Sequence, residues 1–580
     1  MTRRRRWIPM VAAVLALGLL TSCSGVPSSS SPEVIRTISG GVAPSPASSI
    51  SPGPGLDPRQ IVSGFLAANV SEDAHHTGAR SYLSGEAAKN WVDTTTSVVN
   101  AYEVGLPDRL TRAVTVTADK LGTVDARGIY TPVTQGSGTT PISLTFGVTL
   151  IGDQWRINAV SNGLLVDRDH FQQTYKSRPL YFFDQGQKRL VSDLRYTALS
   201  GTSLYNWLLV QLIAGPRAEL QSAYTSDFPE PSARVAVTLG SAGAVVDLPG
   251  TGQLDAASKA RLAVQLSFTF HTDFAPLTIA LMDGAKPVAI PNVATPFSLT
   301  SFPSYTANTG PPPVYYVRSG AVVDENGLAV GGTTRDAVVD IDSIAVAART
   351  GGLLLAATKG KVALAQLAVG PLSGPLTSTD VPAGPLTRPA WAPGLSEVWV
   401  GDGQRLFRIP SLGGPALPVS LASSSGSVNG QISSVAISPD GVRIALIIVA
   451  ADLTSQLWIG SIVRAAGGAS IQSLEPITPV DLHLSDVAWN DVSTLYTIGV
   501  DSTRPGTYGI WSVQMDGSLL TSRTLTNLPG APDSITASQY ALPWVSAKTA
   551  VWVQRGPENA WTAPSGPGGT AYGTYPTYVQ

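Results

Sequence analysis

A short apolar motif recurs five times in the C-terminal half of the chain, and this recurrence limits the folds that the chain can adopt. The copies are Ser343–Ala347, Arg388–Ala392, Ser434–Ser438, Asp486–Asn490 and Ser534–Ala537. Aligned on residues 345, 390, 436, 488 and 536, they are spaced by 45, 46, 52 and 48 residues. A period in this range is typical of solenoids and β-propellers.

The third copy shows what each repeat contains. Residues 432–438 predict a strand, Pro439 and Gly441 stand where a type I turn prefers them, and residues 443–449 predict a buried second strand. Repeats of four short antiparallel strands that close into a ring form a propeller. We therefore predict an all-β propeller of about five blades over residues 314–580. Val314–Val317 are expected to complete the final blade, and a weak sixth blade is an alternative.

The N-terminus predicts export and lipidation. Arg3 to Arg6 precede an uncharged run that ends at Leu20-Thr21-Ser22-Cys23, and Cys23 is the only cysteine of the 580 residues. A basic segment, a short apolar segment and small residues before the cut describe a secretory signal peptide. The last four residues resemble the bacterial lipobox, in which the cysteine is acylated. We predict a signal peptide over 1–22 and a lipid on Cys23, with lipobox residues Leu20, Thr21 and Ser22.

Charge and composition narrow the class of protein. Without the four arginines of the signal peptide, the chain has 34 basic and 40 acidic residues, a net charge of −6. Nucleic-acid binding, which needs a basic surface, is therefore not expected. The 57 glycines and 44 prolines favour a turn-rich, mostly β protein. The single cysteine leaves no partner for an internal disulfide.

The rest of the chain divides into a tether and two α+β domains. Serine- and proline-rich residues 23–55 predict a flexible tether, which would span roughly 30 Å as a random coil. Residues 56–167 predict a first α+β domain, with a helix capped by Asp57 and then strands. Residues 168–303 predict a second one, with helices capped by Ser203 and Asp255. Residues 304–313 form a proline-bearing linker.

Signatures of catalysis and of metal or cofactor binding are absent from the sequence. It has no Gly-x-Ser-x-Gly, no His-Glu-x-x-His and no phosphate-binding loop. His75 and His76 beside Glu72 and Asp73 form the one cluster that resembles metal ligands, but adjacent histidines on a helix point about 100° apart. We expect these residues to lie at a solvated helix end or loop.

The remaining candidates also favour structural roles. His170, His271 and His483 are isolated in the sequence, and we expect each of them to be structural. Asp340 and Asp342 flank a repeat strand, so we expect roles in turns and blade edges in preference to a pair of glycosidase carboxylates. We predict no catalytic residue, no metal and no cofactor.

The second domain resembles the GerMN domain of spore-germination proteins and actinobacterial lipoproteins. The resemblance rests on Tyr181-Phe182-Phe183, Leu212 to Pro216, Val245 to Leu248 and Met282-Asp283-Gly284. With the lipobox, the first α+β domain and the propeller, the chain resembles the actinobacterial LpqB lipoprotein family over nearly all of its expected mature length.

This resemblance implies a function. It implies a lipoprotein on the outer side of the cell membrane that assists a two-component system. Its expected partner is the extracellular domain of a sensor kinase of the MtrB type, which acts on the regulator MtrA, and its expected role also includes cell-envelope processes. The alternative is a binder of cell-wall glycan or peptide, or an envelope enzyme, that uses the propeller channel.

Overall fold

A computed structural model describes residues 52–580 with thirteen short gaps. The gaps are residues 74, 231–233, 272–276, 306–309, 331–339, 361–363, 424–425, 427, 466, 505, 524, 556–559 and 565–571. Cys23, the rest of the lipobox and the tether up to residue 51 lie outside the described residues. No helix among the described residues is long and apolar enough to span a membrane.

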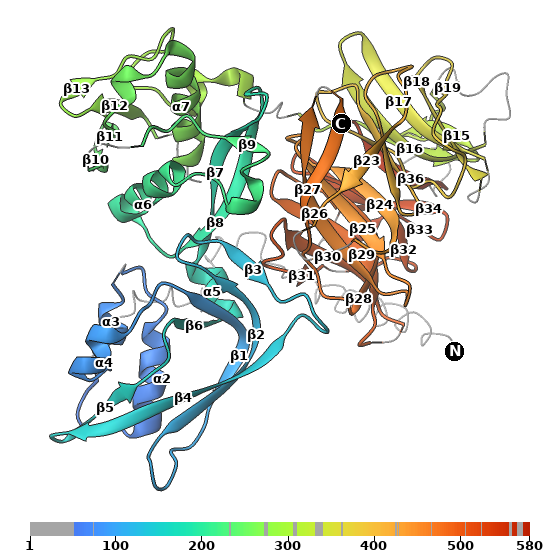
Figure 1. Cartoon of the computed structure of the whole chain (residues 1–580). Helices are drawn as coiled ribbons and strands as arrows, with labels where there is room; N and C mark the ends of the chain where they lie inside the picture. The colour runs from blue at the N-terminus through green and yellow to red at the C-terminus, as the bar shows by residue number, and fades with distance from the viewer. Residues whose placement is uncertain are drawn as a thin grey trace, which may run out of the picture. The chain divides into compact units, whose positions relative to one another are not determined.

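The first α+β domain packs helices on a curved sheet (Figure 1). Its helices are α2 (Pro58–Ala68), α3 (Thr77–Arg80) and α4 (Gly85–Asn90). Its strands are β1 (Thr96–Val104), β2 (Val114–Val124), β3 (Tyr130–Pro132), β4 (Thr140–Ile151), β5 (Gln154–Ala159) and β6 (Leu164–Asp167), in the order β5-β4-β2-β1-β6 with β3 on β2. The Asp57 side chain accepts from the Gln60 amide, so the predicted cap of α2 is confirmed.

The second domain contains two small sheets and two long helices. It comprises α5 (Arg168–Thr174), β7 (Lys176–Asp184), β8 (Leu190–Thr197), α6 (Gly201–Ile213), β9 (Tyr224–Thr225), β10 (Ala236–Gly240), β11 (Gly243–Asp247), α7 (Ala256–Thr269), β12 (Ile279–Asp283) and β13 (Lys286–Pro287). Asp255 caps α7 as predicted. The predicted Ser203 cap is wrong, because α6 begins at Gly201 and Ser203 already lies within its first turn.

The C-terminal strands form a β-propeller whose described strands group into six blades. The first blade combines β14 (Val314–Arg318), β15 (Ala321–Asp324) and β36 (Thr574–Tyr578). The second blade is β16 (Ile341–Arg349), β17 (Gly352–Lys359), β18 (Gln366–Pro371) and β19 (Thr377–Ser378). The third blade is β20 (Ala390–Trp391), β21 (Val398–Asp402), β22 (Arg405–Ile409) and β23 (Leu417–Leu421). The fourth is β24 (Gln431–Ile437), β25 (Arg443–Val449), β26 (Ser455–Ala465), β27 (Gly468–Pro476). Its outer strand β27 pairs in parallel with β23 of the third blade, so these two blades form one eight-stranded sheet.

The last two blades are built in the same way. The fifth is β28 (Leu482–Trp489), β29 (Thr494–Asp501), β30 (Tyr508–Gln514), β31 (Thr521–Ser522), and the sixth is β32 (Pro532–Ser538), β33 (Ala541–Ala547), β34 (Ala550–Gln554), β35 (Trp561–Thr562). Each innermost strand contacts that of the next blade, and β36 contacts both β32 and β16. The six innermost strands therefore close into a ring.

The described strands thus match the alternative of a sixth blade in place of the expected five. The five motif copies are the innermost strands of blades two to six. The innermost strand of the first blade is β36, which reads Thr-Tyr-Pro-Thr-Tyr and lacks the motif. Val314–Val317 close the ring as expected, but they do so by pairing with β36 and β15 in the first blade and not with the blade of Ser534–Ala537. Joining the two ends of the repeat region in one blade closes the ring and protects its edges.

Tryptophans on the innermost strands link neighbouring blades. Trp391 Nε1 donates to the Ala345 carbonyl at 3.0 Å, and Trp489 Nε1 donates to the Ala436 carbonyl at 3.3 Å. Both indoles are buried, so their polar groups need these partners. Each bond joins one motif copy to the previous copy in the chain, which makes the contact between blades specific.

The second domain and the propeller share apolar cores. Val442, between β24 and β25, is buried within the core of the second domain, and Leu194 of β8 is buried within a propeller core. Polar contacts accompany them, because Arg189 donates to the Asp440 carbonyl at 3.1 Å. Residues 50–580 accordingly form one compact unit.

Candidate functional site

The first position of the repeated motif places one side chain of each of five blades around the propeller channel. These residues are Ser343, Arg388, Ser434, Asp486 and Ser534. Three of them are serines, two of which bond within their own blade: Ser343 contacts Thr358 at 2.7 Å, and Ser534 contacts Ser546 at 2.8 Å. The other two positions carry opposite charges, which we call the cross-channel pair, Arg388 and Asp486.

The cross-channel pair connects blades that are not neighbours. Arg388 precedes β20 in the third blade, and its Nη2 lies 3.1 Å from Oδ2 of Asp486 in the fifth blade. The same guanidinium donates to the carbonyls of Ile535 in the sixth blade at 3.1 Å and Pro576 in the first at 3.4 Å. A single side chain therefore reaches across the channel.

Asp486 is held by further donors. Its Oδ1 accepts from Ser434 Oγ at 2.6 Å, and its Oδ2 accepts from the Ile535 amide at 2.9 Å. The residue is 5% exposed, so a carboxylate there needs such partners. The pair and its hydrogen-bond partners thus link five of the six blades.

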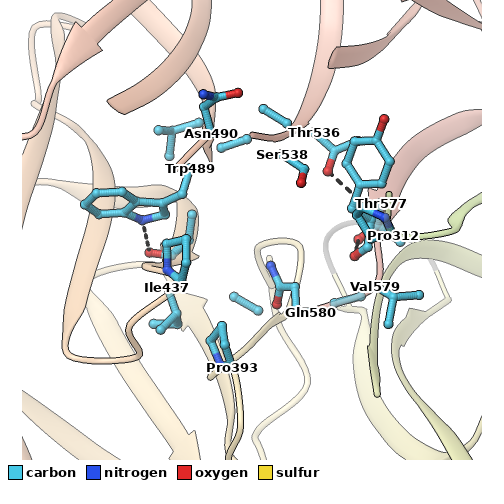
Figure 2. A pocket seen from close by; sticks show the side chains of 18 of the residues that line it. Pro312, Pro393, Ile437, Trp489, Asn490, Thr536, Ser538, Thr577, Val579 and Gln580 are labelled. Atoms are coloured by element: carbon cyan, nitrogen blue, oxygen red, sulfur yellow. Dashed lines mark hydrogen bonds between the residues drawn. The ribbon is translucent and has the colours of Figure 1, made fainter. Parts of the chain in front are cut away.

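Beyond the cross-channel pair, toward the ends of the innermost strands, the channel widens into a cavity of about 230 Å³. Small side chains make this space, because the third motif position is Ala345, Ala390, Ala436, Ala488 or Thr536. Figure 2 shows the cavity, with Pro393, Ile437, Trp489, Asn490, Ser538 and Thr577 around an open centre. Gln580 lies at the same level, and its side-chain oxygen accepts from the Trp391 amide at 3.1 Å.

The cavity carries little acid–base chemistry. Of the residues that line it, Arg388, Tyr540 and Tyr578 are the titratable ones, and no carboxylate or histidine side chain is among them. Burial raises the pKa of Tyr578, which donates to the Leu542 carbonyl. A phenol held neutral in this way is a structural donor. The lining of small, apolar and amide side chains suits binding better than proton transfer.

The one sequence cluster that resembles metal ligands, around His75 and His76, lies in the turn before α3 and at its start. Asp73 lies in the turn before α3, where its Oδ2 accepts from the Thr77 amide at 2.8 Å, and hydrogen bonds from Thr77 and His75 lower its pKa to about 2. His76 Nδ1 lies 3.1 Å from Asp93. Among the described residues, no group of three or more His, Cys, Asp or Glu is placed to hold a metal ion.

Of the three isolated histidines, His170 has a local contact, whereas His271 and His483 are exposed. His170 Nδ1 lies 2.6 Å from Asp167, the cap of α5. Asp342 stands at the start of β16, one residue before the motif, and burial followed by the nearby charge of Asp340 raises its pKa. His271 is exposed, and His483 is an exposed residue of β28.

Sequence reasoning missed the cross-channel pair. The motif is recognised by the alanine at its third position, whereas the two charges stand at its first. A charged residue of each sign at a position that is otherwise serine was the available signal. Cys23, Leu20, Thr21 and Ser22 lie outside the described residues, so lipidation stays a prediction.

Two family models match the chain. The model for the N-terminal domain of lipoprotein LpqB matches residues 51–172, and the model for the LpqB β-propeller domain matches residues 319–576. Lipoprotein LpqB of Mycolicibacterium smegmatis is 30% identical over 76% of this chain and 78% of its own length. Lipoprotein LpqB of Rhodococcus opacus is 27% identical over 93% of this chain and 92% of its own length.

Solved structures with similarity to the chain include the crystal structure of TolB from Acinetobacter baumannii. It is 11% identical, with a TM-score of 0.34, over 48% of this chain and 69% of TolB.

Proposed function

The chain belongs to the LpqB lipoprotein family, and we propose that it is an accessory of a two-component sensor kinase that acts by binding. In this proposal the lipid on Cys23 holds the protein on the outer side of the cell membrane, and the described domains bind the extracellular part of a kinase of the MtrB type. The relatives' description as lipoproteins supports membrane anchoring in the envelope.

The observation that carries this proposal is the chemistry of the propeller cavity. A catalytic channel needs converging free carboxylates, histidines or a nucleophile. This lining offers alanines, prolines, amides and hydroxyls, and its one cation, Arg388, is engaged by Asp486 and two carbonyls. Loops on a rigid scaffold are the usual carriers of binding, and the rim of the cavity consists of such loops.

The tether strengthens the argument for a membrane partner. A protein tethered in the plane of the membrane meets an ectodomain in the same plane at high effective concentration, so a modest affinity is sufficient. Deleting the anchor should therefore impair signalling more than it impairs binding in solution.

A photo-crosslinking experiment in the native host tests the proposal. A crosslinking residue at Gln539, which lies on the cavity rim, should capture the sensor kinase. The same residue at Leu364, which is 70% exposed in the β17–β18 connection on the opposite face, is the matched control. Capture of the kinase from neither position would contradict the proposal.

A second candidate is a binder of cell-wall glycan or peptide, or an envelope enzyme, and the cavity of about 230 Å³ favours it. In that case the purified protein should bind or hydrolyse wall fragments. Trp489→Ala, at the cavity, should abolish this binding or hydrolysis. Turnover of a wall polymer without kinase capture would decide for this candidate.

A further inference from the structure

The loop that joins β1 and β2 exposes two leucines almost completely. Leu106 is 80% exposed and Leu110 is 93% exposed in this loop, which we call the tip loop, residues 105–113 (Figure 1). The loop is internally braced, because Asp108 Oδ1 accepts from the Leu110 amide at 2.9 Å and the Thr111 amide at 2.7 Å. A loop held in this shape keeps both leucines exposed to water.

A second apolar turn lies at the same end of the sheet. Val114 of β2 pairs with Phe146 of β4, and β4 continues from Phe146 in the direction of the tip loop. It ends at Leu150 and Ile151, each 53% exposed, before the turn into β5. Both turns therefore extend the same edge of the first domain toward solvent.

The polypeptide also enters the domain at this end. The Nε of Arg59, in the first turn of α2, donates to the carbonyl of Val104 at 3.1 Å, and Val104 is the last residue of β1 before the tip loop. The first helix of the described chain thus begins beside the end of β1, two residues before Leu106.

The charge of the tip loop suits a lipid surface. Arg109 and Arg112 are exposed, and the single carboxylate of the loop, Asp108, is engaged by its own backbone. Leucines flanked by arginines enter the boundary between headgroups and acyl chains, and arginines favour anionic lipids. A lipid anchor holds more firmly when a second membrane contact supports it.

We infer that the tip loop inserts Leu106 and Leu110 into the membrane that carries the protein's own lipid anchor. The inference rests on the proposed membrane location and is independent of the sensor kinase. Its consequence is that the first domain contacts the bilayer through the tip loop.

Site-specific fluorescence tests this inference, because residues 50–580 contain no cysteine and form one compact unit. Leu110→Cys is introduced into a protein made of residues 50–580 alone. It is labelled with an environment-sensitive dye and mixed with phosphatidylcholine vesicles, with or without phosphatidylglycerol. Leu453→Cys is the control, since Leu453 is 74% exposed in the β25–β26 turn of the propeller.

The dye at Leu110 should shift to the blue on adding vesicles that contain phosphatidylglycerol, and the dye at Leu453 should not. Leu106→Ser with Leu110→Ser should lower the vesicle-bound fraction about ten-fold. No shift at Leu110, or an equal shift at both positions, overturns the inference. A shift at Leu110 with the purified kinase ectodomain and none with vesicles also overturns it, and assigns the loop to protein binding.

Discussion

Arg388 and Asp486 bring two charges into a channel that the remaining motif residues line with serine and alanine. Desolvating such a pair is costly, and its own attraction repays the cost only when further hydrogen bonds satisfy both groups. Asp486 has the Ser434 hydroxyl and the Ile535 amide, and Arg388 has two carbonyls. The pair therefore specifies how the blades are arranged around the axis.

Removing one member of the cross-channel pair should cost more than removing both charges. Arg388→Ala leaves the Asp486 carboxylate buried without its cation, and should lower the free energy of unfolding by about 3 kcal/mol. Arg388→Met combined with Asp486→Asn removes both charges and should lower it by less. Urea denaturation of Arg388→Met, Asp486→Asn and the double variant that combines them measures the coupling. Additive effects would show that the two side chains act independently.

A second buried cluster predicts sensitivity to acid. Glu397 is 4% exposed and accepts from Arg464 Nη2 at 2.9 Å and Arg408 Nη2 at 2.5 Å. Burial opposes ionisation, but hydrogen bonds from Arg464 and Arg408 outweigh it and lower the pKa of Glu397 below its usual 4.5. A carboxylate with a lowered folded-state pKa stabilises the fold above its unfolded pKa, and this contribution is lost as the pH falls through the folded value.

Glu397→Gln should therefore lower the free energy of unfolding by roughly 2 kcal/mol at pH 7. The difference from the unmodified protein should shrink as the pH falls below 4.5, the ordinary glutamate pKa. Thermal melts across this range provide the measurement, with the exposed Glu103→Gln as the control. Parallel pH profiles for the unmodified protein and Glu397→Gln would argue against the role given to Glu397.

At the scale of elements, the sequence predicted those parts whose signals are local. Asp57 and Asp255 each sit directly before an apolar helical pattern, and both cap a helix. Ser203 has the right chemistry for a cap, but α6 starts at Gly201, whose backbone is in the left-handed region with φ of +54°. Cap residues are common within the first turn, so composition alone does not locate the first residue.

The propeller was predicted where a strand is buried on both sides and missed where the repeat is split. Five innermost strands share a motif because each packs between two blades. The first blade joins strands from residues 314–324 and 574–578, and no local pattern connects segments so far apart. The cross-channel pair was missed for a similar reason, since Arg388 and Asp486 meet only after the ring has closed.

The strand β36 should be essential for the stability of the propeller. Tyr578 is 6% exposed, and its amide donates to Thr536 Oγ1 at 3.2 Å in the sixth blade. Tyr578→Ala should lower the free energy of unfolding by about 3 kcal/mol, because it leaves a cavity where blades one and six meet. Tyr572→Ala, at a tyrosine that is 63% exposed, is the matched control. Equal stability of the two variants in urea would refute a closing role for β36.

At the scale of the whole molecule, the proposed function combines an anchor at one end with a rigid binding unit at the other. Cys23→Ala should release the protein from the membrane or leave its signal peptide uncleaved, because acylation precedes cleavage in lipoproteins. Fractionation of cells, followed by mass measurement of the N-terminus, distinguishes the two results. A cleaved variant that still sediments with membranes would reveal a different anchor.

The linker should be cut by proteases without separating the parts that it joins. Residues 304–313 carry prolines and a glycine between two folded regions, where proteases cut most readily. However, Val442 is buried in the core of the second domain, Leu194 is buried in a propeller core, and Tyr196 Oη lies 2.5 Å from Ser518 Oγ. We expect the two fragments to elute together from a sizing column after cleavage.

Arg189→Ala, which removes the bond to the Asp440 carbonyl, should weaken this association, whereas Arg59→Ala in the first domain should not. Fragments that separate immediately after cleavage would show that the propeller acts as an independent module.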